Sequence, residues 1–341
     1  MKFDIVTFGS AAQDVHIKSK AFKILQDKKD FSTGSGICLP FGSKIDVEAL
    51  EFASGGGGTN TAATFAKQGF KVAYCGAIGI DVAGLEIVRE LKHLRVDTRF
   101  VVKKKEKHTN HSIIISSASA DRTIMIYRGA SDLLCDKDIK WHKIKKTRWF
   151  YLAPLTDTAC DIFGNLISFA KGNNIKVACN PSKQQLTLPV DELRKIFSKI
   201  DVLFLNQEEA SILTKVDYKD EIEIFKKLDE LCPGVVIMTK GGEGVVVSDG
   251  KYLYSAPGSG KIETKIVDTT GAGDSFASGF LSDYIRTNGD IEKAIQLGLA
   301  NSLANLTKVG AKSGILEKNA KFERIPVAKQ LCAENNLCIT K

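Results

Sequence analysis

From about residue 131 onward, short apolar segments alternate regularly with segments of helical period, and this pattern most constrains the fold. The apolar segments 148–154, 176–181 and 201–206 are nearly continuous in hydrophobic residues, and each precedes a helix-like segment. Strands buried on both faces are typical of parallel sheets, in which helices form the crossover connections. The alternation therefore predicts an α/β fold in which a mostly parallel sheet is flanked by helices on both faces.

Two stretches interrupt this alternation. Residues 13–52 and 99–130 contain short alternating pieces separated by polar loops, a pattern typical of β-hairpins. Because ligands of open α/β sheets bind outside the carboxyl ends of the strands, we expect the two stretches to form a small β-sheet lid over that crevice. The α/β core domain, which would carry the nucleotide site, is then expected to consist of residues 1–12, 53–98 and 131–341.

Composition and charge indicate an ordinary globular protein. The 341 residues are 43% hydrophobic and 26% charged. A chain of this length and hydrophobic fraction can bury a full core without disulfides or structural metals. The formal net charge is +8, from 48 Lys and Arg against 40 Asp and Glu. The cations are scattered along the chain, so we interpret them as a lysine-rich surface and do not expect a nucleic-acid partner.

Cysteine usage and hydropathy bear on the compartment. The eight cysteines form no CxxC pair, and several lie in apolar runs, where cysteine behaves as a small hydrophobic residue. The chain runs from its first residues directly into an apolar segment, and no apolar stretch approaches 18 residues. We therefore expect a cytoplasmic protein with reduced thiols and without a membrane partner.

The segment with the clearest chemistry is VDTTGAGDSF, residues 267–276, which lies between a strand-like and a helix-like segment. Glycines let the backbone approach a ligand closely, and the free N–H groups of a helix start attract anions. Asp274, in the first turn of that helix, could accept a proton from a hydroxyl while the amides hold a phosphoryl group. The alternative is structural, with Asp274 as a favourable first-turn acid and Asp268 as a turn residue.

The same segment resembles the second signature motif of the ribokinase-like (phosphofructokinase-B) carbohydrate kinase family. The first signature is present as SGGGGTNTA, residues 54–62, followed by GAIGIDVAG, residues 76–84. The resemblance extends from about residue 4 to residue 315. It implies a phosphotransferase with an alcohol group as acceptor, which transfers the γ-phosphoryl group of ATP to a primary hydroxyl of a sugar or sugar-like molecule.

The resemblance also assigns roles at the site of transfer. Asp274 would be the general base, and a monovalent cation, K⁺ in many relatives, would lie at Asp268 and the carbonyl of Thr270. Asn206 and Glu209 would order Mg²⁺ near the phosphates, with Glu209 acting through water. The anion hole for the phosphoryl group would be formed by Gly271, Ala272 and Gly273. The nucleotide-binding positions would be Thr239, Lys240, Gly241, Gly244 and Asn301.

On the acceptor side, the resemblance places Asp14 against sugar hydroxyls, because a carboxylate can accept hydrogen bonds from two of them. Gly55, Gly56 and Asn60 would approach the sugar from the next strand–helix turn, and Asn180 would face the same crevice. The structural alternative for Asp14 is a loop aspartate that caps a turn.

Two departures from the family pattern leave the acceptor open. Ribokinases usually carry lysine where this chain has Gly57, and the arginine that fructokinases often place after the strand ending near Asn180 is missing. Pentoses, hexoses, keto-deoxy acids and nucleosides all stay open, and Tyr127 and Arg128 are candidates to reach the acceptor from the lid. A nucleoside kinase would need an apolar or aromatic pocket in the lid, to which the candidate contributors are Phe22, Phe31, Phe41 and Phe100.

Two further expectations concern assembly and a rival function. The exposed β edges of such a lid are compatible with a homodimer formed through it. A catalytically idle, ligand-binding regulator on the same fold is the rival from another functional class, and the intact GAGD and N-x-x-E motifs argue against it.

Overall fold

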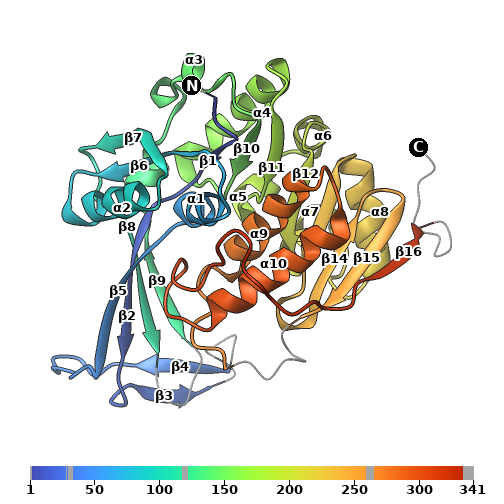
Figure 1. Cartoon of the computed structure of the whole chain (residues 1–341). Helices are drawn as coiled ribbons and strands as arrows, with labels where there is room; N and C mark the ends of the chain where they lie inside the picture. Colours follow the sequence, from blue (N-terminus) through green and yellow to red (C-terminus); the bar gives the residue numbers. More distant parts are fainter. Residues whose placement is uncertain (1, 28, 30–33, 117–121, 259–264, 333–341) are drawn as a thin grey trace.

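The computed structural model describes residues 2–27, 29, 34–116, 122–258 and 265–332, and its centre is a ten-stranded sheet (Figure 1). The strand order is β16-β15-β14-β13-β12-β11-β10-β1-β6-β7. Neighbours pair in parallel from β7 through to β13, and β14, β15 and β16 add an antiparallel edge. The predicted fold class, mostly parallel α/β, is confirmed.

The elements of this core have the following bounds. The strands are β1 Ile5–Phe8, β6 Val72–Gly79, β7 Asp97–Lys104, β10 Trp149–Leu152, β11 Lys176–Cys179, β12 Val202–Asn206, β13 Val235–Thr239, β14 Gly244–Ser248, β15 Tyr252–Pro257 and β16 Ala328–Leu331. The helices are α1 Gly57–Lys67, α2 Val82–His93, α3 Trp141–Ile144, α4 Phe163–Gly172, α5 Lys183–Leu186, α6 Val190–Phe197, α7 Gln207–Thr214, α8 Glu221–Leu231, α9 Ala272–Arg286 and α10 Ile291–Leu306. Short 3-10 helices span Ala130–Leu133, Asp136–Asp138, Asp157–Ile162 and Gly241–Glu243.

Alternation along the buried strands produces two apolar layers. In β1, Val6 and Phe8 pack into the cluster that also contains residues of α4, α6 and α8. Ile5 points to the opposite face and packs in the cluster that contains residues of α1, α9 and α10. Successive strand residues face opposite sides of a sheet, so a strand whose residues are all buried needs helices on both faces.

A second, smaller sheet forms the lid. It consists of β2 (Ala12–Lys18), β5 (Ala49–Gly55), β8 (Asn110–Ser116) and β9 (Thr123–Tyr127), in the order β5-β2-β8-β9. A two-stranded ribbon of β3 (Lys23–Gln26) and β4 (Ser35–Cys38) lies at its far end (Figure 1). The lid therefore combines segments from two separate places in the chain, as the sequence predicts.

One predicted boundary differs from the structure. Residues 99–104 were assigned to the lid, but they belong to β7, which pairs in parallel with β6 in the large sheet. The physical reason is the packing of Phe100, which is 3% exposed and contacts the ring of Phe3 edge to face at 5.8 Å between centroids. The second contribution to the lid is thus the hairpin of β8 and β9.

Close backbone packing joins β1, β6 and the start of α1 at the point where β1 ends. The Gly58 carbonyl accepts a hydrogen bond from the Thr7 hydroxyl (2.9 Å), and the Gly9 carbonyl accepts one from the Tyr74 hydroxyl (3.0 Å). A Cβ atom on Gly58 would lie 2.8 Å from the carbonyl carbon of Gly9 and from the Tyr74 ring. Only glycine fits there, so the packing fixes the turn that leads from the lid into α1.

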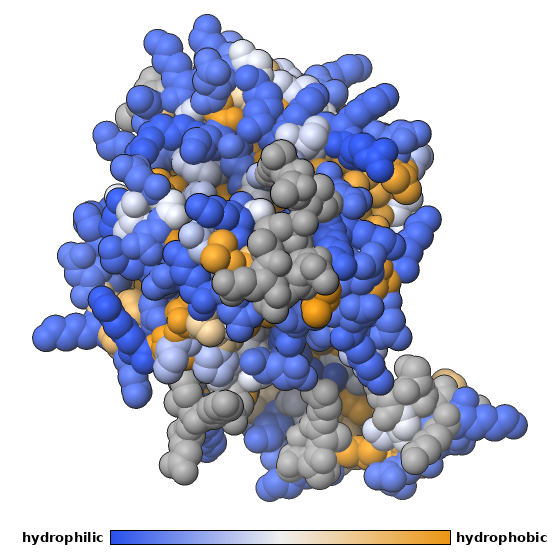
Figure 2. All heavy atoms as spheres, turned by 90° about the vertical axis from the view of Figure 1, so that its right-hand side faces the viewer, coloured by the Kyte–Doolittle hydropathy of each residue, from blue (hydrophilic) through white to orange (hydrophobic). Residues whose placement is uncertain are grey.

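The surface in Figure 2 is mostly hydrophilic, with hydrophobic residues in small separate groups. Within the described part of the chain, no helix is both long and apolar enough to span a membrane. Five cysteines in this part are free thiols, namely Cys38, Cys75, Cys135, Cys160 and Cys179.

We expect Gly58→Ala to destabilise the fold by about 1–3 kcal/mol, because the added methyl group overlaps backbone and ring atoms that have no room to move. The matched control is Gly164→Ala in α4, where nothing lies within 4 Å of the new Cβ and helix propensity favours alanine. Thermal unfolding of both variants checks this. A Gly58→Ala variant as stable as the Gly164→Ala control would contradict the packing described.

Candidate active site

Two carboxylates from distant parts of the chain meet where the lid covers the core. Asp274 lies in the first turn of α9, and Asp14 lies in β2 of the lid and is 3% exposed. The side-chain amide of Asn60, in α1, donates a hydrogen bond to Oδ2 of Asp274 at 2.8 Å. The sequence predicts that Asn60 contacts the acceptor, and the structure shows a bond from Asn60 to the candidate base.

The glycine turn before α1 runs along both carboxylates. A Cβ atom on Gly55 would lie 2.2 Å from Oδ2 of Asp14, and one on Gly57 would lie 3.4 Å from Oδ1 of Asp274. Gly56 has φ +95°, and its Cβ would lie 2.5 Å from the Ser10 carbonyl oxygen. Because this turn carries no side chains, its backbone lies directly against the two buried carboxylates. The acceptor role of Gly55 and Gly56 stays a prediction.

The electrostatics of the pair follow from its burial. Asp274 keeps some accessible surface, but its carboxyl group is enclosed by protein, and this burial raises its pKa above the ordinary value. The hydrogen bond from Asn60 and the positive charge of Lys312 oppose the rise, whereas Asp14 adds to it. Burial likewise raises the pKa of Asp14, against a hydrogen bond with Ser112. The site therefore makes the protonated form of each carboxyl more accessible than it is in water.

Lys312 is a buried cation that the sequence analysis did not identify. It is 7% exposed, and its ammonium group donates to the Ser54 hydroxyl at 2.7 Å and lies 3.3 Å from Oε2 of Glu90. Burial lowers its pKa, and the attraction of Glu90, Asp14 and Asp274 opposes that change. Its only signal in the sequence is a lysine in a run of small residues, which also fits a surface loop.

The start of α9 has the geometry expected of an anion site. Gly271, the residue before the helix, has φ +72°, and a Cβ there would lie 2.4 Å from the Cβ of Ala311. Ala272 and Gly273 form the first turn, and nothing lies within 4 Å of a Cβ built on Gly273. Backbone N–H groups at a helix start lack intrahelical acceptors and carry partial positive charge. A phosphoryl group can therefore approach this turn directly, beside Asp274.

A cavity of about 250 Å³ opens on the other side of this turn. Thr239, Gly241 and Gly244 line this cavity, and their nucleotide-binding role stays a prediction. Apolar side chains supply much of the rest, a surface suited to a planar base. These side chains are Ile266, Phe276, Leu299, Leu303 and Leu306.

Two predicted nucleotide-binding side chains point elsewhere. Lys240 does not line this cavity, and its ammonium pairs with Oε2 of Glu221 at 2.8 Å. Asn301 is fully buried, where its amide donates to the Ser275 carbonyl (2.7 Å) and accepts from the Leu316 backbone (2.7 Å). Asn301 thus connects α9, α10 and the following segment, and its neighbours on α10 contact the cavity.

Asn206 and Glu209 form a capping box at the start of α7. Oδ1 of Asn206 accepts from the Glu209 backbone (2.8 Å), and Oε2 of Glu209 accepts from the Asn206 backbone (2.9 Å). Burial raises the pKa of Glu209, while hydrogen bonds from Asn206 and Asn180 and the charge of Lys183 lower it. Asn180 therefore groups with Glu209 in the structure. Its amide also donates to the Phe204 carbonyl at 3.1 Å.

The family resemblance implies Mg²⁺ at this arrangement of Asn206 and Glu209. Among the described residues, no three His, Cys, Asp or Glu side chains are arranged to hold a metal ion. Mg²⁺ in kinases usually keeps several waters and is held by one or two carboxylates and the substrate phosphates. A single carboxylate at Glu209, with the amide of Asn206 beside it, fits that mode of binding.

Tyr151, in β10, is a second residue that sequence reasoning missed. Its hydroxyl is fully buried and has no hydrogen-bond partner among the described residues. Burial raises its pKa well above the usual range, and the charges of Asp274 and Glu209 add to the rise. The hydroxyl is thus neutral and influenced by both functional carboxylates, although a tyrosine in an apolar strand gives no such signal in the sequence.

Other lid residues that the sequence singled out do not join the site. Tyr127 is 45% exposed, Arg128 is also exposed, and the described contacts bring neither to the two carboxylates. Phe41 is fully exposed, Phe22 is partly exposed, and Phe100 lies in the core as described above. Phe31 lies outside the described residues.

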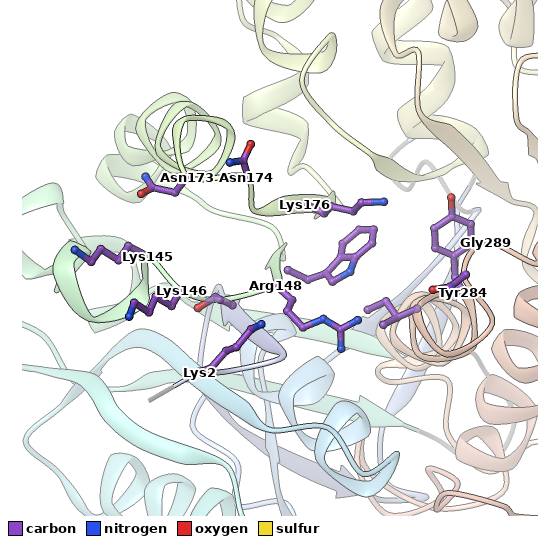
Figure 3. Close-up of a pocket in the computed structure, with 13 residues that line it drawn as sticks. Lys2, Lys145, Lys146, Arg148, Asn173, Asn174, Lys176, Tyr284 and Gly289 are labelled. Atoms are coloured by element: carbon purple, nitrogen blue, oxygen red, sulfur yellow. The ribbon is translucent and has the colours of Figure 1, made fainter.

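A larger, basic cavity of about 640 Å³ lies at the other end of the strands and is shown in Figure 3. It is found where β10 and β11 begin and where α4 and α9 end. The cations that line it are Lys2, Lys145, Lys146, Arg148 and Lys176. Two of them have partners within the protein. Arg148 pairs with Asp4 at 3.3 Å, and the Lys176 ammonium lies 5.5 Å from the centroid of the Trp149 ring.

Comparison with known proteins gives a consistent result. Residues 4–319 match the model of the pfkB family carbohydrate kinases. The chain is 28% identical over 288 residues to a ribokinase of Haemophilus influenzae, covering 83% of this chain and 90% of that protein. It is 27% identical over 248 residues to a nucleoside kinase of Methanothermobacter thermautotrophicus, covering 70% and 74%. The ribokinase structure of Arabidopsis thaliana with ribose and ATP superposes with a TM-score of 0.73 at 20% identity, covering 93% and 96%.

We expect Lys312→Met to raise the pKa of Asp274 and of Asp14 further, because it removes the buried positive charge that now favours their ionised forms. Carbon-13 NMR titration of labelled aspartate carboxyls measures both values. Lys293→Met, an exposed lysine paired with Asp290 on α10, is the matched control and should leave them unchanged. Equal carboxyl pKa values in wild type and Lys312→Met would show that the lysine does not act on the pair.

Proposed function

Because this chain belongs to the pfkB family of carbohydrate kinases and is thus a phosphotransferase with an alcohol acceptor, we propose that it transfers the γ-phosphoryl group of ATP to a primary hydroxyl of a sugar or sugar-like acceptor. The observation that carries the proposal is the geometry around Asp274. This carboxylate lies in the first turn of α9, beside an open anion site, and is held by Asn60.

The proposed reaction needs little covalent chemistry from the protein. The acceptor hydroxyl gives its proton to Asp274 as its oxygen bonds to the γ-phosphorus, and the bond from that phosphorus to the leaving oxygen of ADP breaks. The backbone N–H groups of Gly271, Ala272 and Gly273 hold the charge of the transferring group. Asp14 orients the acceptor by accepting hydrogen bonds from its other hydroxyls.

Mg²⁺ would supply neutralisation of the phosphate charge, with Asn206 and Glu209 as the residues that would hold it through water. The donor base would lie against the apolar wall of the 250 Å³ cavity. The lid would exclude water from the acceptor and so limit the loss of ATP to hydrolysis.

One observation favours a nucleoside as the second candidate acceptor. By strand register, Ile126 and Ile124 of β9 share the Asp14 face of the lid, opposite Ser112 and Ile114 of β8. Ile124 is 40% exposed and Ile126 is 60% exposed. An apolar surface on that face could cover a base, whereas a free sugar has no need of it.

The opposite face of the lid also carries exposed apolar residues. Leu50 and Phe52 of β5 and Met125 of β9 are each about half exposed or more. Their exposure supports the predicted homodimer through the lid, which stays a prediction.

We expect Asp274→Asn to lower kcat by at least about 100-fold, because the acceptor hydroxyl loses its base, while nucleotide binding is retained. Coupled measurement of ADP release and calorimetric titration with ATP check both parts. Asp283→Asn, near the C-terminal end of the same helix and paired with Arg286, is the control for turnover. Burial raises the pKa of Asp274, so ionisation of this carboxyl destabilises the folded state as the pH rises through that pKa. The asparagine variant carries no such charge, and its thermal midpoint at pH 7 should be no lower than that of wild type. Near-normal turnover would refute the base assignment.

The acceptor is tested by a screen of ADP release over pentoses, hexoses, keto-deoxy acids and nucleosides. We expect acceptor-dependent release with one or more sugars and a lower kcat/KM for nucleosides. Release with nucleosides alone would favour the second candidate function. No acceptor-dependent release in the whole panel would favour the idle, ligand-binding alternative.

A further inference from the structure

Asp268 is the point where the lid and the α9 turn are connected. Its carboxylate is buried and accepts from the backbone N–H groups of Thr270 (2.9 Å) and Gly310 (2.9 Å) and from the Thr270 hydroxyl (2.7 Å). The fourth donor comes from the lid, where the guanidinium of Arg122 lies 2.9 Å from Oδ1. The imidazole of His16, also in the lid, lies 3.8 Å from Oδ2.

The strand register explains why these lid side chains reach the core. His16 lies two residues after Asp14 in β2, on the same face of that strand. Arg122 directly precedes β9 and continues the Asp14 face beyond Ile124. The face that covers the acceptor thus also presents two nitrogen side chains to Asp268.

The second oxygen that was expected to hold a monovalent cation is also engaged. The Thr270 carbonyl accepts a hydrogen bond from the side-chain amide of Asn305 at 3.0 Å. The Thr270 hydroxyl lies 3.3 Å from the same guanidinium nitrogen of Arg122. An alkali cation at these oxygens would face a positive guanidinium and an amide donor at close range. The residues present therefore do not fit the K⁺ site that the family resemblance implies.

We propose that the guanidinium of Arg122 replaces the monovalent cation at Asp268, so that phosphoryl transfer is independent of K⁺ and depends on a lid residue instead. The expected effect of Arg122 on the rate of phosphoryl transfer rests on the proposed kinase function. The replacement of the monovalent cation at Asp268 by Arg122 does not rest on it. Arg122 acts through Asp268 and Thr270, which directly precede the anion-hole turn, and is thus a positioning residue.

This arrangement couples the position of the lid to the transfer site. When the lid is closed, Arg122 holds the segment that leads into Gly271. When the lid moves away, the ion pair with Asp268 breaks and that segment loses its lid contact. Gly310, the backbone donor to Asp268, lies so near the lid that a Cβ on it would be 2.9 Å from the Cβ of Ala53. An inorganic cation at Asp268 would not provide such coupling, because it would stay with the core.

The test compares wild type, Arg122→Ala, Arg122→Lys and a control in KCl, NaCl and choline chloride at equal ionic strength. The control is Arg89→Ala, which removes an exposed Arg–Glu86 pair on α2. Thermal midpoints are read first, because a cation that binds the folded state stabilises it by mass action. We expect wild type and Arg89→Ala to show no K⁺-specific shift, and Arg122→Ala to gain one of a few degrees.

Turnover is the second readout. We expect wild-type kcat to vary less than twofold among the three salts and Arg122→Ala to lose about tenfold in choline chloride, with partial recovery in KCl. Arg122→Lys, which keeps a cation but not the forked geometry, should recover part of the loss without K⁺. A wild-type protein that needs K⁺ for stability or rate would overturn the proposal, as would an Arg122→Ala variant identical to wild type in every salt. If no acceptor is phosphorylated, the proposed function fails. The thermal midpoints in the three salts then still decide whether Arg122 replaces the cation at Asp268.

Discussion

The site depends on a single electrostatic constraint, which is that two like-charged carboxylates are buried close together. Burial raises the pKa of both carboxyls, and the charge of Asp14 raises the pKa of Asp274 further. The surrounding structure offsets this cost with the amide of Asn60 and the buried ammonium of Lys312. Burial raises the pKa of Asp274, and the nearby Lys312 cation opposes that rise. A base with such a pKa suits proton transfer near neutral pH. Glycine is then required at position 55, because a Cβ atom there would lie 2.2 Å from Oδ2 of Asp14.

A second constraint is that the pair joins two parts of the molecule. Asp14 belongs to the lid and Asp274 to the core, so the pair forms where the lid lies against the core. The same face of the lid carries Arg122 to Asp268, immediately before the anion-hole turn. In the proposed mechanism, orientation of the acceptor and ordering of the phosphoryl site both depend on this face of the lid, which would also exclude water.

The sequence predicted the architecture well because strand burial and helix period are local signals. It also singled out Asp274 and the glycine turns, whose proposed chemistry depends on their own motifs and stays a prediction. It missed Lys312, Tyr151 and Arg122, since their roles arise from contacts with residues far away in the chain. It placed 99–104 in the lid because apolar alternation does not distinguish an edge strand of one sheet from that of another. A motif fixes the position of Asn301 in the chain but not the direction of its side chain. The sequence therefore predicts Asn301 at the nucleotide, whereas its side chain is fully buried.

The central claim is that the phosphoryl group moves to an acceptor hydroxyl at Asp274 and not to water. Phosphorus-31 NMR of a reaction with ATP, Mg²⁺ and the acceptor chosen by the screen follows that group directly. The account predicts a new phosphomonoester resonance that grows in step with ADP, with little inorganic phosphate. ADP accompanied only by inorganic phosphate, or a phosphomonoester formed equally fast by Asp274→Asn, would contradict it.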